Sequence, residues 1–264
     1  MVTRGRKARG PAPNRAAQLP NWGFYVQLRK RRGAGVSVAT LLLSLGLLAG
    51  LLPTSASAAG TSILLNQDFQ ALPTGKTWSD GSVHGDLKSQ FNGYGSVGVV
   101  RSRGKVLSLE PKVATKPSVT HAALVTSTEK YKDIQLTVRQ KTVKQLRDGS
   151  QPNTWETAWT VWHYTDNTHF YYLILKPNGW ELGKADPKYP GAQRFLATGT
   201  SAKFPVGSWN TVEIRQEGNA IDVTVDGQHL THFVDNERPY TGGSVGMYCE
   251  DARVFFDDLS VEKV

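Results

Sequence analysis

Apolar and polar residues alternate along most of the chain after residue 60, and Gly, Asn, Asp and Pro separate the alternating runs. A period of two is typical of strands that bury one face, and no run in this part repeats with the period of a helix. The alternation predicts strands at residues 105–110, 120–125, 133–140, 157–164, 169–176, 180–184, 209–217, 220–226, 229–234, 244–250 and 253–261. We therefore expect one all-β domain over residues 59–264, built as a two-sheet antiparallel jelly-roll sandwich.

One hairpin, at residues 209–226, can be placed in register from its turn. The turn at Gly218 and Asn219 places Ile214 opposite Val223, on an apolar face that we expect to belong to the core. The other face carries charged residues of both signs, which is typical of a solvated surface. We expect no chemistry from this hairpin.

A second hairpin turns at Asp166 and Asn167 and carries large side chains on both faces. The turn predicts that Tyr164 pairs with His169. With this register, one face of the hairpin is expected to be part of the hydrophobic core. The other face then carries Thr157, Trp159, Val161, His163, Phe170, Tyr172, Ile174 and Lys176.

Charged residues from neighbouring segments extend this second face. The next turn is expected to bring Glu181 opposite Lys176 on the same side. In residues 133–140 the alternation points Arg139 outward, and Arg139 joins the face if that strand neighbours the hairpin.

The aromatic side chains of this face are of the kind that binds a sugar. Eight of the 25 aromatic residues lie between Trp155 and Trp180. Trp159 and Phe170 can stack on the apolar side of a pyranose ring, while Glu181 accepts hydrogen bonds from ring hydroxyls. The alternative is that aromatic residues are common in strands and that both faces are covered.

The same face favours a polysaccharide lyase slightly over a hydrolase. Hydrolysis of a glycosidic bond calls for two carboxylates, and Glu181 is the one found on this face. A β-elimination lyase instead needs a cation to neutralise a uronate carboxylate, here Arg139 or Lys176. It also needs a group that moves a proton, here His163 or Tyr172.

The first 58 residues have the pattern of a secretion signal. A basic cluster at residues 29–32 precedes an apolar run at 36–52, and an A-x-A-type cleavage site follows at 56–58. A membrane anchor needs about 20 apolar residues, and this run is shorter and interrupted. We expect a secreted, extracellular protein exported by the general secretory route, with no membrane contact after cleavage. The long basic region suggests as a hypothesis that translation starts at Val26 and that residues 1–25 are a misassigned start.

The signal also accounts for the net charge of +9. Nine of the 31 Lys and Arg residues lie in residues 1–58, which contain no Asp or Glu, so 22 basic residues remain against 22 acidic ones. A formally neutral mature domain gives no reason to expect a nucleic-acid partner.

The cysteine content decides whether a disulfide can stabilise the domain, and two acidic residues are candidate ligands of a metal ion. Cys249 is the single cysteine, so the chain has no internal disulfide, and its apolar surroundings favour a buried, inert thiol. The first and last strands of jelly rolls are often adjacent, so Asp68 and Asp257 are candidate ligands of a structural calcium ion. The alternative is that both are solvated acidic residues at strand ends. We expect no other cofactor.

Four segments resemble the laminin-G/concanavalin A-like superfamily, and most closely its 3-keto-disaccharide hydrolase-like and exo-inulinase accessory-domain branch. They are NQDFQALPTG, HFYYLILKPNGWELGK, SWNTVEIRQEGNAIDVTVDGQ and GGSVGMYCEDARVFFDDLSVEKV. The resemblance implies the jelly-roll fold and a carbohydrate theme but no particular catalytic residue, because the superfamily includes hydrolases, lyases and lectins.

Together these observations predict a secreted, monomeric, carbohydrate-active protein that acts on an extracellular polysaccharide. Cleavage, as a lyase or a glycoside hydrolase, is favoured because a non-catalytic module usually accompanies a catalytic domain. A lectin-like binding or adhesion protein is the alternative.

Overall fold

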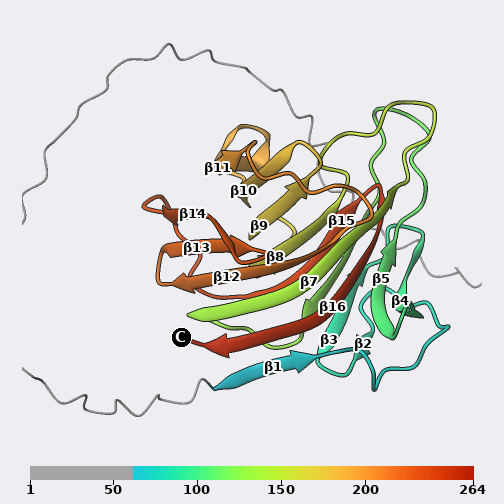
Figure 1. Cartoon of the computed structure of the whole chain (residues 1–264), viewed down its shortest axis with the longest axis horizontal. Coiled ribbons are helices and arrows are strands. Elements are labelled where there is room, and N and C mark those ends of the chain that lie inside the picture. Colours follow the sequence, from blue (N-terminus) through green and yellow to red (C-terminus); the bar gives the residue numbers. More distant parts are fainter. Residues whose placement is uncertain (1–61) are drawn as a thin grey trace, which may run out of the picture. The chain divides into compact units, whose positions relative to one another are not determined.

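A computed structural model describes residues 62–264, which form two antiparallel sheets (Figure 1). Sheet A contains β1 (Ile63–Gln67), β4 (Ser96–Arg101), β5 (Lys105–Glu110), β7 (Ile134–Gln145), β12 (Trp209–Glu217), β13 (Ala220–Val225), β14 (Gln228–Val234) and β16 (Ala252–Lys263). Sheet B contains β2 (Val83–His84), β3 (Leu87–Phe91), β6 (Ala122–Ser127), β8 (Ala158–Asp166), β9 (His169–Lys176), β10 (Gly179–Ala185), β11 (Gln193–Gly199) and β15 (Ser244–Glu250). A single 3-10 turn, Pro190–Ala192, interrupts the strands in this part of the chain. The expected jelly-roll sandwich is confirmed.

The core lies between the two sheets and follows the alternation of the sequence. In β7 the inward positions are Ile134, Leu136 and Val138, all fully buried, while the residues between them are half-buried. In sheet B the rings of Trp162 and Tyr171 point into the same core. One face of each strand is therefore apolar because it covers the other sheet.

Strand β16 occupies the middle of sheet A. It pairs with β7 along one side and with β5 and then β1 along the other. Figure 1 shows β16 between β7 and β1. The expected adjacency of the first and last strands is confirmed.

The first predicted hairpin has the expected register. Ile214 pairs with Val223 and Arg215 with Asp222. In the second hairpin the expected register holds from Trp159 to Trp162 and then shifts.

The pairing of Tyr164 with His169 is wrong, because Asp166 takes the place opposite His169. The shift coincides with His163, whose φ of 49° is a left-handed conformation that is uncommon outside glycine. The expected register of Glu181 is also wrong by two residues: Lys176 pairs with Gly179, while Glu181 pairs with Ile174.

All eleven predicted strands are present, but the first four strands and β11 lie outside the predicted ranges. The residues of strand β11 are half-buried or exposed, because the strand lies at the edge of sheet B, and they do not alternate clearly. Strands β2 and β3 are short and largely polar.

Cys249 is fully buried and free, as expected for an inert thiol, and burial raises its pKa well above the usual value. The secretion signal, its cleavage site and the alternative start at Val26 lie outside the described residues. Within residues 62–264 no helix has the length and apolar character of a membrane span.

Candidate functional site

The outer face of sheet B, meaning the face that points away from the core, carries aromatic and acidic side chains on neighbouring strands. Cross-strand pairing aligns Glu181, Ile174, Trp159 and Tyr248 in one row across β10, β9, β8 and β15. The ring of Trp159 lies 5.2 Å from that of Tyr172 and 5.0 Å from that of Tyr248, measured between centroids. Trp159 is therefore the centre of an aromatic cluster, on the face where the hairpin register placed it.

This face is nearly inaccessible to solvent. Trp159 is 4% exposed, Tyr172 1% and Tyr248 3%. The alternative that both faces of these strands are covered therefore describes the structure correctly. Polar groups within the cluster accordingly lie in a medium of low dielectric constant, where charges interact strongly.

Glu181 lies on one side of the cluster with two partners. Its carboxylate accepts a hydrogen bond from Lys176 Nζ at 2.9 Å and one from the Tyr172 hydroxyl at 3.3 Å. The amide of Gln193 donates to the same hydroxyl. Burial, and then the negative charge of Glu181, raise the pKa of Tyr172 well above 10, so its hydroxyl stays protonated.

Glu250 lies on the other side and is 4% exposed. The hydroxyl of Tyr248 donates to its Oε1 at 2.7 Å. Burial raises the pKa of Glu250 to about 7, and the negative charges of Asp251 and Glu156 add to the effect. A carboxyl group with this pKa can both take up and release a proton near neutral pH.

Arg147 holds the carboxylates next to Glu250 in place. Its guanidinium lies 2.6 Å from Glu156 Oε1 and 2.7 Å from Asp251 Oδ2, and these three side chains are almost completely buried. One cation thus faces three buried carboxyl groups, counting Glu250. The pKa of Asp251 is also raised, to about 6, chiefly by burial.

Arg139, a predicted catalytic residue, does not lie on this face, and the expectation that it would is wrong. Its strand, β7, pairs with β12 and β16 and so belongs to sheet A. There Arg139 Nη1 lies 2.9 Å from Asp258 Oδ2, and its guanidinium is 5.0 Å from the centroid of the Trp209 ring. Of the two predicted cations, the structure brings Lys176 alone to the aromatic cluster.

His163, another predicted catalytic residue, is a buried structural residue. Its Nδ1 lies 2.7 Å from the backbone oxygen of Tyr240, and its Nε2 lies 2.9 Å from that of Lys132. Both ring nitrogens are engaged with the backbone, so neither is placed to move a substrate proton. The predicted residues Tyr172, Lys176, Trp159, Phe170 and Glu181 do share the outer face.

The candidate calcium ligands lie near each other: Asp68 directly follows β1, whose last residue pairs with Leu259, and Asp257 lies in the middle of β16, where its register with β7 shifts. Burial raises the pKa of Asp257, and the charges of Asp258 and Asp68 contribute to this rise. Arg139 Nη1 lies 3.9 Å from Asp257 and supplies positive charge at this point. Within residues 62–264 no three His, Cys, Asp or Glu side chains are arranged to hold a metal ion, and calcium binding stays a prediction.

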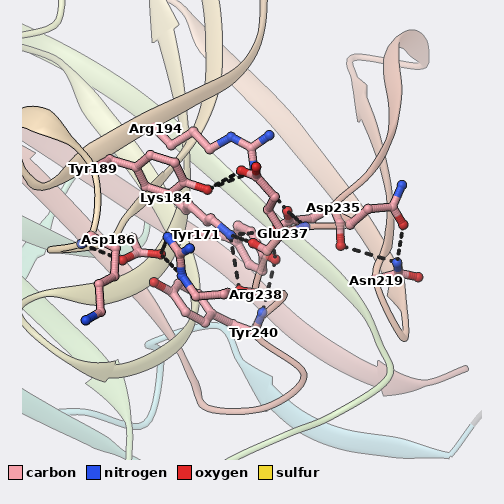
Figure 2. A network of polar contacts seen from close by, with 12 residues as sticks. Tyr171, Lys184, Asp186, Tyr189, Arg194, Asn219, Asp235, Glu237, Arg238 and Tyr240 are labelled. Carbon is pink, nitrogen blue, oxygen red and sulfur yellow. Dashed lines mark hydrogen bonds and ion pairs between the residues drawn. The ribbon is translucent and has the colours of Figure 1, made fainter.

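A second polar cluster joins sheet B to the loop that follows β14 (Figure 2). Lys184 Nζ lies 2.6 Å from Asp235 Oδ2, and both side chains are completely buried. The Tyr171 hydroxyl donates to the same oxygen at 2.7 Å. Because Lys184 belongs to β10 and Asp235 follows β14, this ion pair links the two sheets.

Towards the solvent the second cluster continues around the ring of Tyr189. The guanidinium groups of Arg194 and Arg238 lie 5.3 and 4.8 Å from the centroid of this ring. Arg194 pairs with Glu237 at 2.8 Å and Arg238 with Asp186 at 2.8 Å. Each cation has a carboxylate partner, so the cluster carries no net charge. We interpret it as a cluster that stabilises the fold.

Gly183 makes room for the Tyr172 hydroxyl, because a Cβ at position 183 would overlap it. We expect Gly183→Ala to displace this ring and to lower the free energy of unfolding by about 1–3 kcal/mol. Near-ultraviolet circular dichroism and urea unfolding measure the two effects. Gly242→Ala is the control and should change both less, because the nearest atom there is 3.3 Å from the place that a Cβ would take.

Glu250 and Tyr248 are not among the predicted site residues. The run VGMYCE predicts a strand, and its apolar residues around Cys249 indicate the core side. Alternation alone places Tyr248 and Glu250 together on the face opposite Met247 and Cys249. That signal was present in the sequence.

Comparison with known proteins gives a family and a fold. The sequence model of the 3-keto-alpha-glucoside-1,2-lyase-like domain matches residues 73–262. No curated protein matches the chain at a significant level of sequence similarity.

Similar solved structures have low sequence identity and so bear on the fold alone. A Bacillus subtilis protein of unknown function with a galectin-like fold has a TM-score of 0.50 at 12% identity, over 76% of this chain and 96% of that one. SCLam, a non-specific endo-beta-1,3(4)-glucanase of family GH16, has a TM-score of 0.50 at 10% identity, over 78% and 92% of the two chains. Both support the concanavalin A-like jelly roll.

Proposed function

The chain belongs to the 3-keto-alpha-glucoside-1,2-lyase-like family and is thereby carbohydrate-active, and from that premise we propose that it cleaves a 3-keto-glycoside by β-elimination on the outer face of sheet B. The observation that carries the proposal is Glu250, a buried carboxyl group with a pKa of about 7 beside an aromatic cluster. Trp159 would lie against the sugar ring. Because this face is covered in the structure, a substrate reaches it only when the covering residues move aside.

Glu250 has the properties of a general base for this reaction. A ketone at C3 of the sugar acidifies the hydrogen on C2, so one base of near-neutral pKa suffices to remove it. The C–H electron pair becomes the C1=C2 double bond as the C1–O bond breaks. The departing oxygen takes a proton and leaves as an alcohol.

Tyr172 is the residue to which we assign the supply of that proton. Its ring contacts Trp159 from β9, whereas the ring of Tyr248 contacts Trp159 from β15 on the other side of β8, and Glu250 is among the charges that raise the pKa of Tyr172. Glu181 and Gln193 hold the hydroxyl in position. Water then returns a proton to Tyr172 and removes one from Glu250, which restores both groups.

Two-carboxylate hydrolysis is less well supported by the same face. Glu181 and Glu250 lie on strands separated by two others, which places their backbones about 14 Å apart at the usual strand spacing. Hydrolases hold their two carboxyl groups roughly 5–9.5 Å apart on either side of the bond. Here the carboxylate of Glu181 is engaged with Lys176 and Tyr172, and that of Glu250 with Tyr248. Elimination needs one base and therefore fits this arrangement better.

A matched pair of substrates tests the proposal. We expect the purified protein to cleave a 3-keto-glucoside and to leave the same glucoside with a C3 hydroxyl intact, because the unoxidised sugar lacks the acidic hydrogen. Deuterium at C2 should slow the reaction. Release of the alcohol and formation of the unsaturated sugar are both measured by chromatography.

Glu250→Gln should lower kcat by about 10²- to 10⁴-fold, the usual contribution of a general base. Glu217→Gln, at the end of β12 with its side chain exposed, is the matched control and should leave kcat unchanged. Equal cleavage of both substrates would indicate hydrolysis. Binding of both without turnover would support the lectin-like alternative.

We further propose that the protein acts outside the cell after removal of residues 1–58, as the N-terminal pattern predicts. N-terminal sequencing of protein recovered from the culture medium tests this, and a mature start upstream of Ala59 would contradict the cleavage site.

A further inference from the structure

The most exposed aromatic side chain of residues 62–264 is Tyr94, in the turn that leads from β3 in sheet B to β4 in sheet A. It is 67% exposed. Single exposed apolar residues are common in soluble proteins and by themselves indicate no function. The backbone of Tyr94 and the residues around it, however, give this ring a fixed place next to the proposed site.

The turn holds Tyr94 in an uncommon backbone conformation. Its φ of 60° is left-handed, a region that Asn and Gly adopt with less strain than tyrosine. The Tyr94 amide donates to Asn92 Oδ1 at 3.0 Å, and the turn packs so closely that a Cβ at Gly93 would overlap the backbone oxygen of Ala122. Strained conformations persist where the surrounding structure imposes them, and they are frequent at ligand-binding sites. The backbone of Tyr94 is therefore held rigidly in place.

Tyr94 contacts His121, which connects it to the proposed site. The two ring centroids are 6.0 Å apart and the ring planes meet at 82°. The amide of His121 donates to Asp251 Oδ1, and the amide of Asp251 donates to the backbone oxygen of His121, both at 2.9 Å. Asp251 directly follows Glu250, the proposed base, and Glu250 pairs with Ala122 next to His121. A continuous set of contacts therefore joins the exposed ring to the residue next to the base.

Lys112 supplies hydrogen-bond donors in the same region. Its backbone amide donates to the oxygen of Gly93 at 3.0 Å, in the turn that holds Tyr94. Its side chain is exposed. Burial chiefly lowers the pKa of His121, and the positive charge of Lys112 adds to this, so the Lys112 amine lies near the His121 ring. An aromatic ring can stack on the apolar side of a pyranose, while an ammonium group beside it donates to the hydroxyls.

We propose that Tyr94 is the stacking platform of a second sugar subsite, which binds a glucose unit of the glycan beyond the unit that is cleaved. The choice of glucose rests on the proposed function, whereas the platform rests on the exposed, fixed ring and on Lys112 near it. The ring of Tyr94 is open to solvent, unlike the covered aromatic cluster around Trp159. A glycan can therefore bind at Tyr94 before the residues that cover the proposed site move aside.

Isothermal titration calorimetry with cellotetraose, laminaritetraose and maltotetraose tests the subsite. These glucose tetramers carry no ketone, so binding is measured without elimination. We expect the wild type to bind at least one of them, and Tyr94→Asn to weaken that binding about threefold to tenfold, the scale of a lost stacking contact. Tyr94→Phe keeps the ring and should bind within about twofold of the wild type.

Phe195→Ala is the matched control. Phe195 is also an exposed ring, at 51%, but it lies on β11, at the edge of sheet B far from β3. This variant should bind like the wild type. Because asparagine suits the left-handed backbone at position 94, Tyr94→Asn should unfold at the same urea concentration as the wild type or at a higher one. Urea unfolding thus separates a loss of binding from a loss of folding.

Four results would each overturn the subsite: no binding of any tetramer, unchanged binding in Tyr94→Asn, an equal loss in Phe195→Ala, or an equal loss in Tyr94→Phe. They would leave the eliminative function standing, because cleavage of a 3-keto-glucoside is measured separately. Conversely, binding that depends on the Tyr94 ring in a protein that cleaves no 3-keto-glucoside would support the subsite and contradict the proposed function.

Discussion

Lys184→Met is expected to lower the free energy of unfolding by about 3–5 kcal/mol, the usual effect of removing one partner from a buried ion pair. Lys184 and Asp235 are both completely buried, 2.6 Å apart. Without the lysine, Asp235 would keep the Tyr171 hydroxyl and a longer contact of 3.3 Å to Arg194. The backbone oxygens of Glu237 and Arg238 would also lose their donor.

Urea unfolding of three variants measures this effect. The double variant Lys184→Met, Asp235→Asn removes both charges and should be more stable than Lys184→Met alone. Lys188→Met, at an exposed position, should change the stability by less than about 0.5 kcal/mol. A loss in Lys184→Met no larger than in Lys188→Met would show that the ion pair does not stabilise the fold.

Glu250→Gln is expected to make the protein more stable above pH 7. Folding raises the pKa of Glu250 from 4.5 to about 7. Below about pH 4.5 both the folded and the unfolded chain hold the proton. Between that value and pH 7 the unfolded chain releases it first, so the wild type loses stability as the pH rises. Glutamine stays neutral and escapes this loss.

The difference should reach about 3 kcal/mol at pH 8 and vanish near pH 4, since each unit of pKa corresponds to about 1.4 kcal/mol. Unfolding by urea across this range measures it. Glu217→Gln, at an exposed position, should follow the wild type at every pH. A constant difference between Glu250→Gln and the wild type would mean that the Glu250 pKa is not raised by folding.

The sign of this effect bears on function. A carboxyl group that destabilises the fold at neutral pH contributes nothing to packing that glutamine could not supply. Residues that lower stability in this way are common at active sites, where activity rather than stability is selected. A gain in stability together with a loss of activity in Glu250→Gln would therefore strengthen its assignment as a base.

Local features of the fold could be predicted from the sequence. The register of Ile214 with Val223 follows from the turn between them, since a short loop and alternation act over a few residues. The predicted pairing of Trp159 with Ile174 is also correct, although the turn lies one residue further along the chain, because the register shift between Trp162 and Asp166 compensates for the difference.

Longer-range features could not be predicted in this way. Alternation shows that Arg139 points outward but not which sheet holds its strand, because sheet order depends on contacts distant in the sequence. Likewise, the buried backbone oxygens that engage His163 belong to loops far from it in the chain. The raised pKa of Glu250 depends chiefly on burial and then on the negative charges of Asp251 and Glu156, an environment that only the folded chain creates.

The central place of β16 in sheet A has a consequence for how the protein is made. Strands β1, β5 and β7 all pair with residues 252–263. Until that segment has left the ribosome, sheet A can exist only in separate parts, which are β4 with β5, β7 with β12, and β1 alone. Contacts of such long sequence separation also form slowly. Sheet A should therefore be completed late, after residues 252–263 have been made.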